Sequence, residues 1–210
     1  MFAMKISKYL TIKWRELVFI LFLSIFSYNI NAQEIDSLII WDKNYKLRWG
    51  DFLGNRTIPM KNFSAISSLE IYLTTTYYKN EVLYYTVIPL FNRNKSVTRN
   101  FNDQLLEHER LHFDILELFA RKIRKEFKLL EENNACENSY LEIFNEYRSS
   151  LWLYQNKYDI ATKHSLNQKN QQIWNVKISK ELNKLEAFSI ENLYNVKVKI
   201  SFFSSTLERI

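Results

Sequence analysis

Glycine, proline, cysteine and histidine are all scarce in this chain. Its 210 residues include two glycines, two prolines, one cysteine and three histidines. The lack of glycine and proline argues against a loop-rich fold, because these residues supply most tight turns. The single cysteine, Cys136, excludes an internal disulfide and leaves a free thiol or an intermolecular bond. We interpret it as an idle residue in a connecting segment. The length is sufficient for one domain with a buried core.

The first 32 residues have the pattern of a secretory signal peptide. The basic residues at the start are Lys5, Lys8, Lys13 and Arg15. The apolar run from 17 to 26 is too short to span a bilayer, which takes about 20 residues. Small residues around Ala32 indicate cleavage there; the alternative is an uncleaved amphiphilic anchor. We therefore expect a signal peptide over 1–32, one domain over 33–210, and an exported protein, periplasmic or extracellular, with no stable membrane span after cleavage.

The positive charge does not predict a nucleic-acid partner. The formal net charge is +6, and part of it lies in the first 32 residues. A nucleic-acid-binding protein usually has a concentrated basic face. The densest basic run, 121–128, places Ile123 and Phe127 four residues apart, as in the buried stripe of a helix. We interpret the charged residues of this run as the solvated side of that helix.

The N-terminal half has the patterns of β-structure. Residues 46–54 predict a short strand that ends in a turn. Residues 67–78 alternate apolar and polar side chains, and residues 82–90 are rich in β-branched and aromatic residues, so the two segments predict a hairpin. Residues 92–102 are polar and predict a loop.

The period then changes to that of helices. Apolar residues and histidines recur every three or four residues from Asn102, which predicts a helix of roughly 25 residues capped by Asn102 or Thr98. Residues 133–138 interrupt it. Further helices are expected over 140–155 and 167–188, the latter burying Ile173, Ile178, Leu182 and Leu185, with a final strand over 195–200. The fold class expected is α+β: a small antiparallel sheet with a hairpin, about three helices, and a C-terminal strand.

Two of the three histidines lie four residues apart in His108-Glu109-Arg110-Leu111-His112. On a helix this spacing places both imidazoles on one face, where they can bind one zinc ion. Glu109 lies beside the first histidine and can act as a general base toward a water on the metal. His108 and His112 also continue the apolar stripe of the helix, which favours burial and therefore a need for partners.

A catalytic zinc ion takes three protein ligands and leaves a fourth position open. Asp114 and Glu117 are on the wrong side of the predicted helix to supply the third. His164, at the expected junction between the second and third helices, is our first candidate. Glu142 and Glu146, four residues apart on the second predicted helix, are the alternatives.

Three segments carry a resemblance to a known family. They are LLEHERLHFDILELFARKI from 105, YDIATKHS from 158 and WGDFLG from 49. Together they resemble domain-of-unknown-function family 922, bacterial proteins described as predicted secreted zinc-dependent proteases. The resemblance implies a zincin-like domain with His108, His112 and His164 as metal ligands and Glu109 as the catalytic residue. The family has glycine after its third histidine, where this chain has Ser165.

These observations predict a secreted, zinc-dependent metallohydrolase, a metallopeptidase acting on a peptide or protein substrate. Glu109 is the expected general base and Tyr158 the expected donor to the oxyanion. Asp159 or Asp114 is expected to orient a ligand histidine. The alternatives are a non-catalytic, zinc-stabilised envelope domain that acts through a protein partner, and an amidase for cell-wall peptides.

Overall fold

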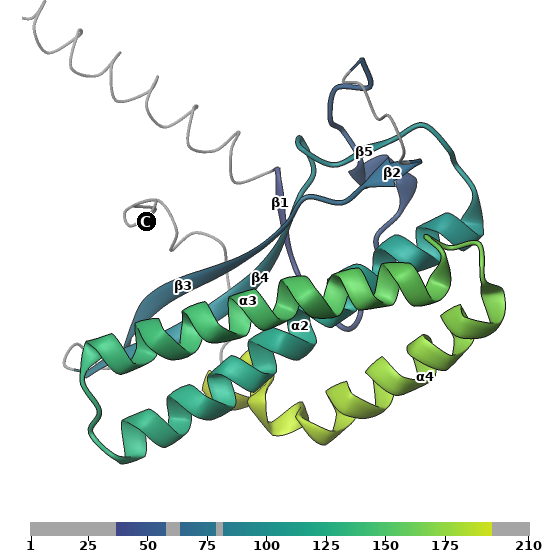
Figure 1. Ribbon diagram of the computed structural model, residues 1–210. Helices are drawn as coiled ribbons and strands as arrows, with labels where there is room; N and C mark the ends of the chain where they lie inside the picture. The colour runs from purple at the N-terminus through teal and green to yellow at the C-terminus, as the bar shows by residue number, and fades with distance from the viewer. Residues whose placement is uncertain (1–36, 58–63, 79–81, 195–210) are drawn as a thin grey trace, which may run out of the picture. The chain divides into compact units, whose positions relative to one another are not determined.

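The structure is a computed structural model that describes residues 37–57, 64–78 and 82–194, all within one compact unit (Figure 1). The predicted signal peptide, its cleavage site near Ala32 and the predicted strand over 195–200 lie outside the described residues. The expected α+β class is confirmed, with a small antiparallel sheet followed by helices. Among the described residues, none of the helices combines the length and the apolar content needed to cross a bilayer.

The sheet has three antiparallel strands in the order β1-β4-β3, formed by Leu38–Ile40, Val82–Asn92 and Leu69–Tyr78. β3 and β4 form the predicted hairpin, with Leu69 opposite Phe91 and Thr74 opposite Thr86. A separate two-stranded ribbon pairs β2, Ala65–Ile66, with β5, Val97–Thr98. β5 lies within the segment predicted to be a loop. Because β2 pairs with β5, the chain just before β3 is held near α2 (Asp103–Glu132), the helix that follows β5.

The helices are α2, α3 and α4, formed by Asp103–Glu132, Glu137–Thr162 and Gln168–Lys184; the 3-10 helix η2, Glu186–Phe188, and the short α5, Ile190–Tyr194, follow. The Asn102 side chain accepts hydrogen bonds from the backbone N–H groups of Gln104 and Leu105, as a helix cap does. Cys136 is the exposed N-cap residue of α3. The three predicted helices are thus confirmed, with α2 and α3 longer than expected.

Helix α2 lies at the centre of the described unit. It packs on β4 and β3 on one side and on α3 and α4 on the other, and Figure 1 shows it between these layers. Fourteen of its residues between Leu105 and Ile123 are buried. A helix covered on several sides has little room for a solvated face, so its polar residues must find partners inside the protein.

The prediction that the basic run over 121–128 is wholly solvated is wrong for two of its arginines. Arg121 and Arg124 are only 1% and 2% exposed. Both bind Glu117, with 2.8 Å from Arg121 Nε to Oε1 and 3.1 Å from Arg124 Nη2 to Oε2. The guanidinium groups also donate to the backbone carbonyls of Leu182, Val87 and Phe188, which ties α2 to its neighbours. We call Glu117, Arg121 and Arg124 the arginine cluster.

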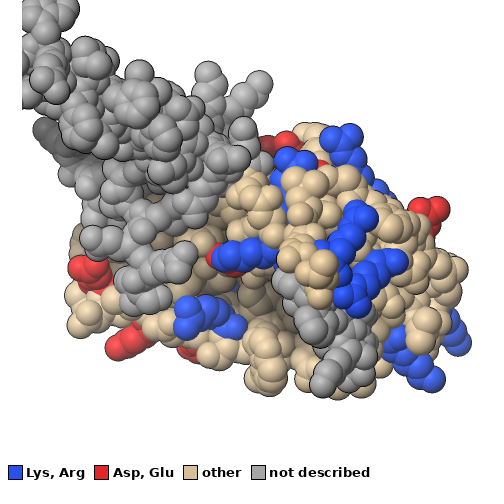
Figure 2. All heavy atoms as spheres, turned by 90° about the horizontal axis from the view of Figure 1, so that it is seen from above, with Lys and Arg blue, Asp and Glu red and all other residues tan. Residues whose placement is uncertain are grey.

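On the face shown in Figure 2, the Lys and Arg side chains lie in several separate groups with uncharged surface between them.

Two further predictions about local structure are wrong. Residues 46–54 form no strand; the 3-10 helix η1, Trp49–Asp51, lies there instead. The buried Asp51 carboxylate accepts hydrogen bonds from the Arg48 N–H and the Tyr45 hydroxyl, so the chain folds around this side chain. Ile173, expected to face inward, is 54% exposed, because α4 faces the core through Gln171, Trp174, Ile178 and Leu182.

Candidate metal centre

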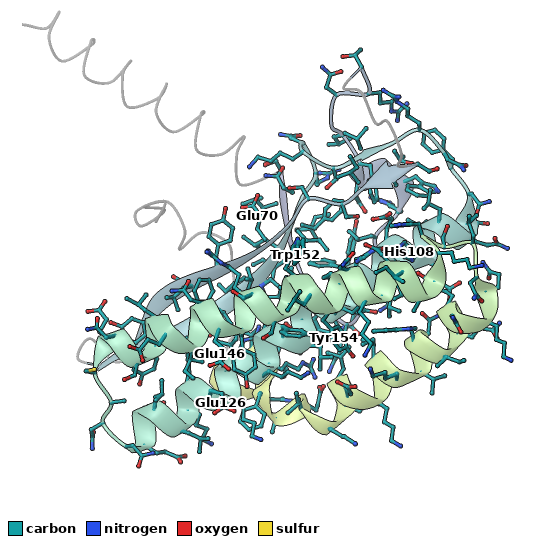
Figure 3. All side chains as sticks on the ribbon, in the orientation of Figure 1. Glu70, His108, Glu126, Glu146, Trp152 and Tyr154 are labelled. Carbon is teal, nitrogen blue, oxygen red and sulfur yellow. The ribbon has the colours of Figure 1, made fainter. Side chains whose placement is uncertain are left out.

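His108 and His112 lie on successive turns of α2 and direct their rings to one point. Their Nε2 atoms are 3.1 Å apart, and the rings meet edge to face with centroids 4.6 Å apart. His108 is 3% exposed, and Figure 3 shows it on α2 beside α3. The spacing of four residues therefore produces the convergence that the sequence predicts.

Helix α3 brings a third donor atom to the same point. Asp159 Oδ1 lies 3.0 Å from His108 Nε2 and 2.9 Å from His112 Nε2. These residues form the one group in the described part of the chain whose donor atoms could hold a metal ion. Donors in a tetrahedral zinc site, at 2.0–2.2 Å from the ion, are roughly 3.4 Å apart. The three atoms are slightly closer than that, so small shifts of the side chains would fit them to the ion. We call these three residues the histidine centre.

Two glutamines hold the far side of the imidazoles. Gln171 Oε1 is 3.2 Å from His108 Nδ1, and Gln155 Oε1 contacts His112 Nδ1. An amide oxygen can only accept, so each Nδ1 carries the proton and each Nε2 presents a lone pair. Buried metal-binding histidines are usually oriented in this way, by a hydrogen bond from the nitrogen that does not bind the ion.

The orientation of both glutamine amides is fixed by neighbouring groups that can only accept a hydrogen bond. Gln155 Nε2 donates to the backbone carbonyl of His112 at 3.0 Å, which turns its oxygen toward the ring. Gln171 Nε2 donates to Asn175 Oδ1 at 2.9 Å, and Asn175 Nδ2 donates to the Glu107 carboxylate. Because a carbonyl and a carboxylate only accept, both glutamines must present their oxygens to the histidines.

The histidine centre therefore places three electron-rich atoms against one another. Burial raises the pKa of Asp159, but the hydrogen bonds that its carboxylate accepts when His108 and His112 carry a proton on Nε2 outweigh burial and hold this pKa well below its usual range. Burial lowers the pKa of His112, and the Asp159 hydrogen bond together with the Glu109 charge outweighs it, so this pKa is raised. The two directions have one cause, the attraction between a protonated His112 and the Asp159 carboxylate.

Glu109 lies next to the histidine centre and is itself buried, at 5% exposure. Its Oε2 accepts a hydrogen bond of 2.6 Å from the Ser67 hydroxyl, which reaches across from the segment between β2 and β3. Its negative charge acts on both His112 and Tyr158. The structure thus brings together three of the predicted site residues, His108, Glu109 and His112.

His164 lies at the edge of this group. It follows α3, as expected, and its Nδ1 is 3.6 Å from Asp159 Oδ1, but its side chain is 60% exposed. Lys163, His164 and Ser165 all have positive φ, at 51°, 49° and 76°. This left-handed turn presents His164 from the solvent side, while Asp159 occupies the place nearest to both imidazoles.

Tyr158 lies behind His108. It is fully buried, and its ring stacks on the His108 ring with centroids 4.6 Å apart. Its hydroxyl donates to Gln171 Oε1 at 2.9 Å and is 3.2 Å from the backbone carbonyl of His108. Burial raises its pKa, so the hydroxyl keeps its proton. These contacts lie on the Nδ1 side of the ring, away from the point where the donors meet, and give no support to the predicted role at an oxyanion.

The remaining predicted residues have other surroundings. Asp114 accepts a hydrogen bond of 2.7 Å from Trp41 Nε1 and pairs with Lys46, so its contacts are not with a histidine. Burial raises its pKa. Glu142 and Glu146 are exposed on α3, and Figure 3 shows Glu146 well away from His108 along that helix. They do not join the histidine centre.

Sequence reasoning did not identify Gln155, Gln171 or Ser67. Gln155 precedes Asp159 by four residues, so both lie on one face of α3, and that spacing was a usable signal. Gln171 and Ser67 reach the site through the packing of α4 and of the segment between β2 and β3. No local pattern marks either of them.

The chain was also compared with known proteins. No family model matches it, and neither a curated protein nor a solved structure does. The resemblance to family 922 therefore remains a prediction from the sequence.

Proposed function

We propose that the protein is a zinc-dependent metallohydrolase that cleaves peptide bonds. The observation that supports this proposal is the meeting of His108 Nε2, His112 Nε2 and Asp159 Oδ1 within 3.1 Å, with both Nδ1 protons held elsewhere. No proton of the neutral rings can lie between these atoms. A divalent cation satisfies all three lone pairs at once.

His108, His112 and Asp159 would hold the ion, and Gln155 and Gln171 would keep the imidazoles in the required tautomer. Zinc supplies Lewis-acid chemistry at such a site: it polarises a carbonyl and lowers the pKa of water to about 7. Glu109 would accept the proton of the attacking water and pass it to the leaving amine. Its charge acts on His112, which supports this role.

Two histidines and one carboxylate also suit ferrous iron, which many oxygenases bind with this donor set. The buried carboxylate of Glu109 favours hydrolysis, since a general base is what the attack of water requires. Peptide as the substrate class, and export to the periplasm or the medium, are parts of the proposal that depend on the sequence patterns alone.

Metal analysis of the purified protein with a Glu109→Gln variant tests the proposal. We expect about one zinc per chain in both proteins. Hydrolysis of peptides or of cell-wall peptide fragments should fall by roughly 10²- to 10⁴-fold in the variant, because a general base contributes about that much. Which substrate the unaltered protein cleaves separates a peptidase from an amidase. Absence of bound zinc, or iron in its place, would refute the proposal.

One observation favours a second candidate, a non-catalytic domain stabilised by zinc. His164 Nδ1 lies 3.6 Å from Asp159 Oδ1, so a small movement of its turn would add a fourth ligand and close the site. The His164→Ala variant separates the two functions. A catalytic site with three ligands keeps its zinc and its activity, whereas a closed structural site loses affinity and the fold loses stability.

A further inference from the structure

We propose that Ser67 is a positioning residue that holds the Glu109 carboxylate in place as the general base. The inference rests on the proposed function. It assigns to Ser67, a residue outside any sequence motif, the task of fixing which carboxylate oxygen is free to take the proton.

The contact is short and directional. Ser67 Oγ donates to Glu109 Oε2 at 2.6 Å, a distance typical of a hydrogen bond from a hydroxyl to a charged oxygen. Within the described part of the chain, Glu109 Oε1 has no hydrogen-bond partner. One oxygen is thus held and the other remains available, which is the arrangement that a base needs.

Ser67 is held firmly by its own neighbours. Just before it, Ile66 pairs with Val97 in the β2–β5 ribbon. Just after it, the Ser68 N–H donates to Ser96 Oγ at 2.9 Å, and the Ser68 carbonyl accepts from the Asn92 N–H at 2.9 Å. The hydroxyl is therefore presented from a backbone that is fixed on both sides.

A glutamate side chain has three rotatable bonds. Burial alone would not hold the Glu109 carboxylate in one rotamer. A base that must meet a water at a fixed point loses rate when it spends time in other rotamers. The Ser67 hydrogen bond ties Glu109, on α2, to the segment that connects β2 and β3. The position of the Glu109 carboxylate therefore depends on the position of the segment between β2 and β3.

The test compares Ser67→Ala, Ser67→Thr and the neighbouring control Ser68→Ala in zinc-loaded protein. We expect Ser67→Ala to keep its zinc, its thermal midpoint and its KM, and to lose kcat by roughly 10- to 100-fold, as for one charge-assisted hydrogen bond. Ser67→Thr retains the hydroxyl and should recover most of kcat. Ser68→Ala should match the unaltered protein, because the hydrogen bond to Glu109 comes from Ser67 and the contacts of Ser68 described above are made by its backbone.

A second measurement does not depend on turnover. Acetohydroxamate binds zinc and gives up a proton that a neighbouring carboxylate can accept, so its affinity, measured by calorimetry, reports on the placed Glu109. Ser67→Ala should weaken this binding by about tenfold, but by less than twofold when Glu109 is already glutamine, because the two residues act as a unit.

Equal losses in the two backgrounds, or a Ser67→Ala variant with unchanged kcat and acetohydroxamate affinity, would overturn the role of Ser67 and leave the proposed function standing. Failure of the unaltered protein to bind zinc would overturn both proposals together.

Discussion

Helix α2 buries two polar groups of similar size, the histidine centre and the arginine cluster, and they are satisfied in opposite ways. In the arginine cluster each contact pairs a donor with an acceptor: the guanidinium groups donate to Glu117 and to three backbone carbonyls. In the histidine centre three acceptors face one another, and the ring protons point outward to glutamines. The first is complete with protein groups alone, and the second leaves three acceptors together when the rings are neutral, which is why we propose a cation there.

This difference suits the arginine cluster to a structural role and the histidine centre to the proposed binding of a metal ion. Buried charges are tolerated when they are paired and hydrogen-bonded, and the arginine cluster meets that condition while joining α2 to β4, α4 and η2. Buried lone pairs directed at one another raise the free energy of the metal-free protein. A bound metal ion would compensate for this cost, because its binding free energy adds to the stability of the fold.

The largest expected effect comes from breaking the arginine cluster. Replacing Glu117 with Gln removes the carboxylate shared by Arg121 and Arg124 and sets an amide N–H₂ against their donors. We expect the free energy of unfolding to fall by about 3–5 kcal/mol, as when one partner of a buried ion pair is removed. Urea denaturation measures it. Glu132→Gln, on the exposed end of the same helix, should change stability by about 0.5 kcal/mol at most. A small effect of Glu117→Gln would show that the cluster is not structural.

The arginine cluster also shows where sequence reasoning reached its limit. Alternation predicted the β3–β4 hairpin, and the three- and four-residue period predicted three helices. A three- and four-residue period marks one buried stripe on each helix, whereas α2 has neighbours on several sides. Glu117, Arg121 and Arg124 stand at i, i+4 and i+7, which places them on one face. The spacing was visible, but their burial follows from α2 being covered by elements distant in sequence.

A smaller effect is expected when the support of the histidine centre is removed. Gln171→Leu deletes the acceptor for His108 Nδ1 and for the Tyr158 hydroxyl, so the ring is free to adopt the other tautomer. We expect zinc affinity to fall by roughly 10- to 100-fold, the usual effect of losing such a partner. Competition with a chelating dye measures it.

The neighbouring Gln172 is exposed, and Gln172→Leu serves as the matched control with unchanged zinc affinity. If both variants bound zinc as tightly as the unaltered protein, the tautomer would not be set by Gln171. The histidine centre would then not depend on its neighbouring glutamine, and this difference from the arginine cluster would disappear.

The histidine centre was predictable to the extent that it is local. His108, Glu109 and His112 come from one helical turn, and helix geometry alone places them. Asp159 was expected only to orient a histidine, because its position between the imidazoles depends on how α3 packs against α2. His164 was favoured as a ligand since it completes a set of three histidines, but the turn after α3 leaves its side chain 60% exposed. The packing of α3 against α2, rather than spacing along the chain, decides that Asp159 lies nearer to the two imidazoles than His164 does.

The smallest expected effect concerns backbone strain, which also differs between the two regions. Among the described residues, four that are not glycine have positive φ, and three of them, Lys163, His164 and Ser165, are consecutive beside the histidine centre. Left-handed backbone costs a residue with a Cβ about 1 kcal/mol or more, and strain of this kind gathers at functional sites. Ser165→Gly should therefore raise the free energy of unfolding by about 1 kcal/mol.

The same substitution in a helix should act in the opposite direction. Ser179 is exposed on α4, where Gly is less favourable than Ser, so Ser179→Gly should lower stability by about 0.5 kcal/mol. Urea denaturation of both variants gives the signs. If Ser165→Gly were also destabilising, the serine hydroxyl or the exact path of the turn would matter more than its φ of 76°. If it stabilises the fold and also weakens zinc binding, the strained turn holds His164 toward the ion, and the site has four ligands rather than three.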